Sequence, residues 1–66
     1  MFVAAADDER LWTPQETADY LQVTDSTLRR WRREQIGPAW LKLGRTVRYR
    51  PSDVRAWLAA REHQGD

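Results

Sequence analysis

The residues best suited to chemistry are the arginines of one segment, Thr24-Asp25-Ser26-Thr27-Leu28-Arg29-Arg30-Trp31-Arg32-Arg33-Glu34-Gln35. A guanidinium group can hold guanine O6 and N7 with two N–H groups, or hold a phosphate. At 100° per residue on a helix, Leu28 and Trp31 fall on one side. The residues on the opposite side are Ser26, Arg29, Arg30 and Arg33. The spacing therefore predicts a helix with a narrow apolar face and a broad basic face, although a solvated surface helix has the same pattern.

The charge distribution along the chain favours an anionic partner for this face. Residues 29 to 50 hold eight basic residues against one acid, Glu34, so this stretch carries +7. The rest of the 66-residue chain carries −6, and the formal net charge is +1. A chain that separates its charge in this way presents a basic surface to a partner. Nucleic acid is the leading candidate, ahead of an acidic protein or anionic lipid.

Several other kinds of function find little support in the composition. The chain contains no cysteine, and His63 is its only histidine, so we expect no metal site, no cofactor and no enzymatic activity. Sixty-six residues make one small domain, for which four tryptophans can supply much of the core. The first ten residues lack the basic and apolar regions of a signal peptide, and we find no candidate membrane span. We therefore expect a cytoplasmic protein without a membrane partner.

The elements that must position the arginines begin before them. We interpret residues 1–10 as a flexible arm. The sequence Thr13-Pro14-Gln15-Glu16 combines an N-cap threonine, a proline at the first helical position and a glutamate two residues later, which predicts a capping box and a helix over residues 14–21. Residues 22–24 form a tight turn, and Thr24 caps the arginine-rich helix. Helix, short turn and second helix make a helix-turn-helix pattern.

After the arginines, Gly37 and Pro38 are expected to end the helix, with the glycine as its left-handed cap. Residues 40–43 and 47–50 alternate apolar and basic positions on either side of Gly44-Arg45-Thr46, which predicts a hairpin with a type II′ or short bulged loop. Its outer face and tip carry Lys42, Arg45, Arg48 and Arg50. A closing helix begins at Pro51 and runs to about residue 62, and residues 63–66 fray. Its apolar stripe is Val54, Trp57 and Leu58.

These elements predict a mainly α fold with a small β-hairpin, the winged helix-turn-helix. The chain resembles the excisionase and AlpA-type small DNA-binding proteins, whose fold is similar to the MerR DNA-binding domain. The likeness covers residues 11–60 in unbroken order. It is carried by Leu11 to Leu21, Thr24 to Trp31, Gly37-Pro38, Lys42-Leu43-Gly44, Val47-Arg48-Tyr49 and Asp53 to Leu58. One departure is the turn Gln22-Val23-Thr24-Asp25, where such proteins often have a glycine.

The resemblance implies that double-stranded DNA is the partner. The second helix would enter the major groove through Asp25, Ser26, Thr27, Arg29, Arg30 and Arg33. The hairpin wing would lie along the backbone or minor groove through Lys42, Arg45, Arg48 and Arg50. The function it implies is that of an excisionase, which bends DNA and directs a site-specific integrase. A small AlpA-like transcriptional regulator is the alternative, and an acidic-protein-binding module is an alternative from another class.

Individual residues keep more than one interpretation. Arg29 and Arg30 suit guanine recognition, phosphate binding at the groove edge, or a solvated pair, and Arg33 suits phosphate better than a base. Arg32 lies to the side of the helix and fits either a plain surface position or a phosphate contact. Arg45 either enters a narrow minor groove or is simply exposed at the tip. Trp31 and Trp57 have core spacing, whereas Trp40 could face outward. The short closing helix leaves no coiled coil, so we expect a monomer that associates head to tail on DNA.

Overall fold

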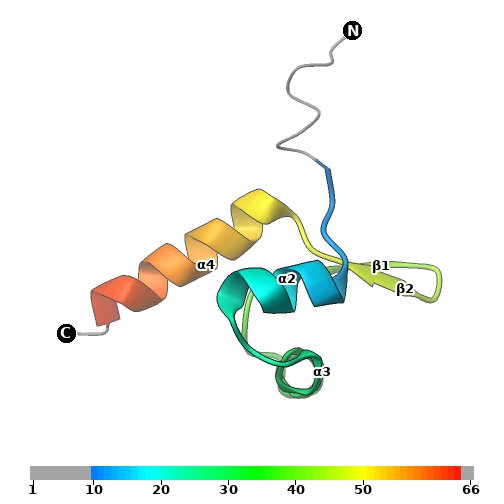
Figure 1. The fold of residues 1–66 in the computed structure, drawn as a ribbon, viewed down its shortest axis with the longest axis horizontal. Helices are drawn as coiled ribbons and strands as arrows, with labels where there is room; N and C mark the ends of the chain where they lie inside the picture. The colour runs from blue at the N-terminus through cyan, green and yellow to red at the C-terminus, as the bar shows by residue number, and fades with distance from the viewer. Residues whose placement is uncertain (1–9, 65–66) are drawn as a thin grey trace, which may run out of the picture.

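The computed structural model describes the backbone of residues 10–64 and the side chains of residues 10–62. Its elements follow in the order α2 (Pro14–Leu21), α3 (Asp25–Glu34), β1 (Leu41–Leu43), β2 (Thr46–Arg48) and α4 (Pro51–Gln64). In Figure 1, α2 lies in the middle with α3 seen end-on below it, while the β-hairpin and α4 project to opposite sides. The fold is mainly helical with one two-stranded antiparallel sheet, which confirms the predicted winged helix-turn-helix class. Of the predicted arm, all but Arg10 lies outside the described residues.

Helix α2 begins with the predicted capping box. The Thr13 hydroxyl accepts a hydrogen bond from the Glu16 amide at 3.0 Å, and Glu16 Oε1 accepts one from the Thr13 amide at 2.9 Å. Pro14 occupies the first helical position, where its missing N–H has no helical partner to lose. The helix therefore starts and ends at the residues that the sequence predicts.

The turn between α2 and α3 has left-handed backbone geometry without a glycine. Gln22 adopts φ 61 and ψ 43, and the Val23 amide donates to the Ala18 carbonyl at 3.0 Å. The left-handed backbone conformation is disfavoured for most residues other than glycine, but the backbone hydrogen bonds of the turn hold Gln22 in it. The absence of a glycine from this turn therefore leaves the helix-turn-helix geometry intact.

The C-cap of helix α3 lies two residues before the predicted cap, Gly37. Gln35 is the left-handed C-cap residue, with φ 61, and its amide donates to the carbonyls of Trp31 and Arg32. Gly37 also has positive φ, at +85°, but its role in the structure is steric. A Cβ at position 37 would lie 2.9 Å from Cε3 of Trp31. The prediction that Gly37 caps the helix is wrong, because the glycine instead leaves room for the indole.

The core lies where the helices meet the base of the hairpin. Its fully buried apolar residues are Ala18, Leu28, Tyr49 and Val54, and Thr17 is buried beside them. The rings of Trp31 and Trp57 lie 5.4 Å apart, which confirms the packing role predicted from their spacing. Trp40 is 38% exposed and faces outward, as the sequence allowed.

The hairpin corrects one prediction about the wing. Its loop is Gly44-Arg45 alone, so Leu43 pairs with Thr46 and Leu41 with Arg48. Directly paired residues share a face, and a register shift of one residue turns a strand's side chains over. Arg48 therefore lies on the face of Leu41 and the 51%-exposed Leu43, whereas Lys42 shares the face of Val47. The predicted single basic outer face is wrong, because the two-residue loop pairs Lys42 with Val47 and Leu41 with Arg48.

Helix α4 packs through its first two turns and then leaves the body. Val54 is buried and Trp57 and Leu58 are half-buried, whereas residues 59–62 are exposed. The helix continues to Gln64, so residues 63 and 64, which were predicted to fray, are helical. Residues 65 and 66 lie outside the described part of the chain.

Candidate nucleic-acid interface

The outward side of α3 carries most of the arginines predicted to meet DNA. Leu28 is fully buried, and the residues exposed on the opposite side are Ser26, Arg29, Arg30 and Arg33. Because the buried leucine fixes the rotation of the helix, these four side chains share the solvent side. This confirms the two-sided pattern read from the spacing.

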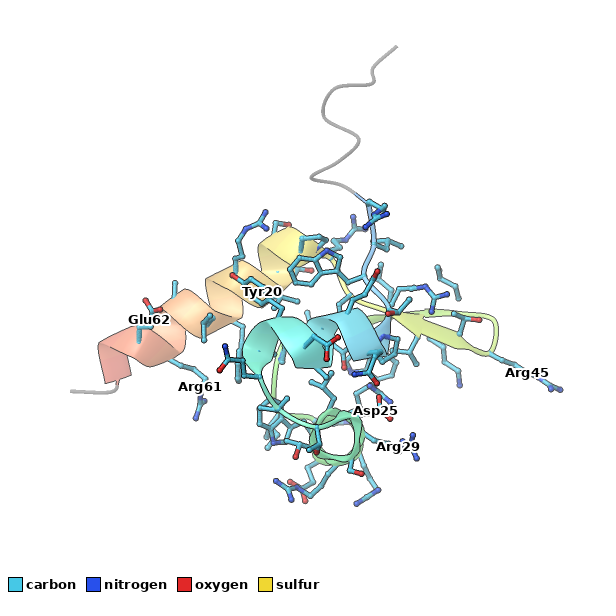
Figure 2. All side chains as sticks on the ribbon, viewed as in Figure 1. Tyr20, Asp25, Arg29, Arg45, Arg61 and Glu62 are labelled. Carbon is cyan, nitrogen blue, oxygen red and sulfur yellow. The ribbon has the colours of Figure 1, made fainter. Side chains whose placement is uncertain are left out.

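Asp25 and Arg29 form an ion pair along this surface. Arg29 Nη2 donates to Asp25 Oδ2 at 2.8 Å, with the arginine side chain 68% exposed and the aspartate side chain 35% exposed. Both side chains are labelled in Figure 2 on the side of α3 nearer the hairpin. The carboxylate thus offsets one charge of the basic face and directs the guanidinium.

Thr27 lies on a different side of α3 from Arg29 and takes part in the N-cap. Its amide donates to the Thr24 hydroxyl at 3.1 Å, and its own hydroxyl accepts from that hydroxyl at 2.9 Å. Two residues of helix separate it from Arg29 by about 160° around the axis. The half-buried Thr27 side chain is therefore part of the N-cap.

Arg32 makes a contact that sequence reasoning missed. Its Nη1 donates to the hydroxyl of Tyr49 at 2.9 Å, and Tyr49 is only 1% exposed. The Tyr49 backbone also exchanges two hydrogen bonds with Trp12, at 2.8 and 2.9 Å, in an isolated bridge. These contacts tie α3 to the base of the wing and to the chain before α2. Their long sequence separations leave no periodic signal that could have found them.

The wing carries basic side chains on both faces and at its tip. Lys42, Arg45 and Arg50 are exposed, and Figure 2 shows Arg45 at the far end of the hairpin. Arg48 is half-buried and donates from Nη1 to the Val47 carbonyl at 2.8 Å. Gly44 has φ +65 and Arg45 does not have positive φ, which fits the predicted type II′ turn. The turn places the Arg45 charge beyond the body of the domain.

Apart from Asp25 and Glu34 on α3, the acidic side chains of residues 10–62 lie on α2 and α4. Glu16 and Asp19 lie on α2, and Asp53 and Glu62 lie on α4. Figure 2 shows Arg61 and Glu62 at the end of the molecule opposite to Arg45. Among the described residues, the basic charge therefore gathers on α3 and the hairpin, while α2 carries two acids without a basic residue and the two acids of α4 are balanced by Arg55 and Arg61.

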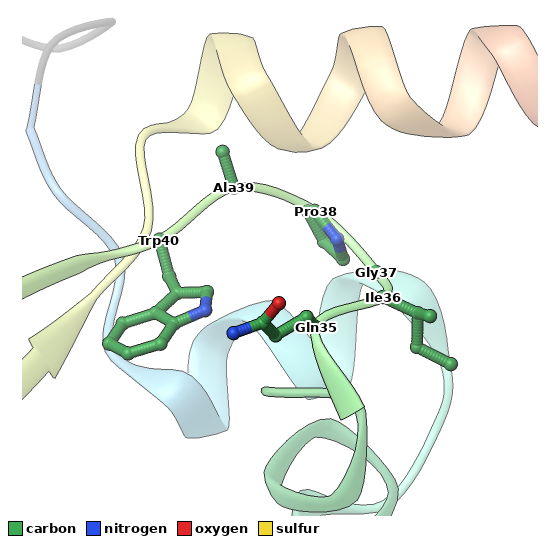
Figure 3. A pocket seen from close by; sticks show the side chains of 6 residues that line it. All are labelled: Gln35, Ile36, Gly37, Pro38, Ala39 and Trp40. Atoms are coloured by element: carbon green, nitrogen blue, oxygen red, sulfur yellow. The ribbon is translucent and has the colours of Figure 1, made fainter. Parts of the chain in front are cut away.

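The described residues offer little for catalysis or metal binding. An open hollow of about 370 Å³ lies beside the loop after α3 (Figure 3). Its lining residues, Gln35, Ile36, Gly37, Pro38, Ala39 and Trp40, carry no charged side chain. Within residues 10–64, no three histidine, cysteine or acidic side chains gather where they could hold a metal ion.

Residues 13–62 match the family model of a helix-turn-helix domain. The chain belongs to this helix-turn-helix family. The match includes α2, α3, both strands and nearly all of α4, so the arginines of α3 belong to the second helix of a DNA-binding domain. A search of curated proteins found no match. The helix-turn-helix part of the resemblance is confirmed, while the narrower likeness to excisionase, AlpA and MerR proteins stays a prediction. No helix of this helix-turn-helix domain, in its described part, is long and apolar enough to cross a membrane.

Proposed function

We propose that this helix-turn-helix protein is a sequence-specific, DNA-bending excisionase that acts with a site-specific integrase. The observation that supports this most is the pair of exposed basic elements, α3 and the wing, joined through the Arg32–Tyr49 contact. A helix can enter the major groove, and a projecting hairpin can reach the neighbouring backbone or minor groove. Two such elements on one small domain suit a duplex that is gripped in adjacent grooves.

On this proposal α3 reads bases and the wing holds the backbone. Arg29 and Arg30 bind guanine edges, with Asp25 and Ser26 beside them, and Arg33 binds phosphate. Thr27 acts through the cap that fixes the start of α3. On the wing, Arg45 enters the minor groove at the hairpin tip. The wing's phosphate contacts are Lys42, Arg48 and Arg50.

The choice of excisionase over a simple repressor depends on assembly. One helix and one wing contact few base pairs, which is too little to select a genomic site. The apolar stripe of α4 is already packed in its own core, since Val54 is buried and Trp57 contacts Trp31. We propose a monomer in solution that binds tandem repeats head to tail, with the acidic α2, which carries Glu16 and Asp19, facing the basic side of the next protomer. Such a contact does not close and can bend DNA as protomers accumulate.

The test begins with selection of preferred duplexes from a random library and footprinting of the selected site. If about six basic residues meet phosphate, the logarithm of the binding constant should fall with log salt at a slope near −5. A slope shallower than about −2 would show that the basic elements are not the DNA surface. In that case the remaining candidate is the acidic-protein-binding module. A small transcriptional regulator would share the steep slope and is separated by the curvature measurement described in the Discussion.

A further inference from the structure

Arg32 is the half-buried arginine of α3, whereas Arg29, Arg30 and Arg33 are exposed. It is half-buried, and its hydrogen bond goes to the neutral Tyr49 hydroxyl at 2.9 Å. No acidic side chain of residues 10–62 lies within ion-pair distance of it. A guanidinium has five N–H donors, and one bond to a phenol leaves most of them for another acceptor. The remaining N–H donors of this guanidinium favour an anionic acceptor, such as a phosphate.

Tyr49 holds this guanidinium in a fixed place. The tyrosine is 1% exposed, and its amide and carbonyl are both paired with Trp12. An arginine side chain in solution has many rotamers, and ordering it on binding costs free energy. The hydrogen bond to Tyr49 favours one arrangement of the half-buried Arg32, so a ligand that binds it there has less side-chain freedom to remove. By contrast, Arg29 is directed by an ion pair that also offsets its charge.

The position of Arg32 on α3 determines whether it can reach base edges or phosphates of a bound duplex. It lies about 60° around the helix from Arg29, toward buried Leu28, and so on the flank of α3 rather than at its outermost line. Tyr49 continues the strand face that carries Val47 and exposed Lys42. Arg32 therefore stands where α3 meets the wing. A base edge at the floor of the major groove lies beyond the reach of such a flank position, whereas the phosphates at the groove wall do not.

We propose that Arg32, positioned by Tyr49, binds one phosphate of the DNA strand that passes between α3 and the wing. This rests on the proposed DNA-binding function and adds a contact that links its two elements. The bound phosphate lies between the base pairs protected by α3 and the minor-groove segment protected by Arg45. Tyr49 is a positioning residue and itself touches no DNA.

The experiment replaces single phosphates of the selected duplex by neutral methylphosphonates, one position at a time. Each duplex is titrated with the unaltered protein, with Arg32→Met and with Tyr49→Phe. Methionine keeps an unbranched stem to pack while it removes the charge, and phenylalanine keeps the buried ring while it removes the acceptor. Arg55→Met on the exposed side of α4 is the matched control, since it removes the same charge away from α3 and the wing.

The unaltered protein should lose about tenfold in affinity at one methylphosphonate between the two footprints. Arg32→Met should lose about the same on the unmodified duplex and then be indifferent to that substitution. Its salt slope should be less steep by about 0.9, the value for one phosphate. Tyr49→Phe should show a partial loss of sensitivity at the same phosphate. Arg55→Met should keep the full sensitivity.

Four results separate the possibilities. If Arg32→Met keeps the phosphate sensitivity and the slope of the unaltered protein, Arg32 binds no phosphate, and the DNA-binding function stands. If it weakens every duplex equally without changing the pattern, its role is only to support the fold, and the proposal is overturned. If Arg32→Met does not fold, the Tyr49→Phe pattern decides: unchanged sensitivity overturns the positioning by Tyr49. A shallow salt slope of the unaltered protein would instead reject the proposed function itself.

Discussion

A carboxylate oxygen of Asp25 lies 2.8 Å from Nη2 of Arg29, one turn further along α3. An exposed pair of this spacing contributes only about 0.3–0.5 kcal/mol to folding, so its main effect is on the arginine. The carboxylate turns the guanidinium toward one direction and offsets its charge. An arginine directed in this way is less free to bind any nearby phosphate.

We expect Asp25→Asn to strengthen binding to random duplex and to lower the preference for the selected site. The asparagine removes the negative charge and the ion pair that direct Arg29, so non-specific attraction rises while base recognition loses geometry. Titrations at one salt concentration measure the ratio of the binding constants for the selected and the scrambled duplex. Glu34→Gln is the control, because it removes an exposed acid of α3 that has no ion pair among the described residues. An equal gain on both duplexes for Asp25→Asn, as for the control, would contradict this role.

Arg30 and Arg48 should divide base recognition from backbone contact. Arg30→Ala should cost roughly 1–3 kcal/mol of discrimination at one base pair, because an exposed arginine on the outward side of α3 can reach a guanine edge. Arg48→Ala should weaken all sequences alike, through one lost phosphate contact. Binding to a panel of single-base variants of the selected site separates the two. The reverse pattern would move the base-reading element from α3 to the wing.

Gly37 and Gly44 should differ in their tolerance of a methyl group, although both have positive φ. At Gly44 nothing lies within 4 Å of an added Cβ, so Gly44→Ala should cost only the backbone term of about 1–2 kcal/mol. At Gly37 the Cβ also meets Trp31 at 2.9 Å, which adds about 1–3 kcal/mol from overpacking. Thermal or urea unfolding of the two variants measures the loss in free energy of unfolding at each position. Equal losses would mean that the contact with Trp31 relaxes freely.

Assembly on DNA should be visible as curvature. We expect sedimentation of the free protein to show a monomer, and a circular-permutation gel shift to show more bending on three direct repeats than on one. The reason is the separation of acidic α2 from basic α3 and wing, which allows head-to-tail contacts that continue along the duplex. A stable free dimer on an inverted repeat, with no added curvature, would favour the transcriptional regulator.

Local interactions account for the parts of the fold that were predicted from the sequence. The α2 capping box spans Thr13 to Glu16, and the α3 cap spans Thr24 to Thr27, so each helix start is encoded within four residues. The opposition of Leu28 to the exposed arginines follows from helix geometry alone. Gly44 likewise supplies the positive φ that the hairpin turn requires. These features depend on residues that are close together along the chain, and sequence patterns can therefore predict them.

Only the tertiary structure decided which surfaces these elements share. The two-residue loop set the register that placed Lys42 and Arg48 on opposite faces of the wing, and a one-residue difference in loop length reverses that result. The contacts of Tyr49 with Trp12 and Arg32 join residues far apart in the sequence, so they arise from packing and have no local signal. The sequence by itself determined a basic helix and a basic hairpin. Their junction at Arg32 exists because the buried Tyr49 hydroxyl needs a hydrogen-bond partner there, which only the packed core determines.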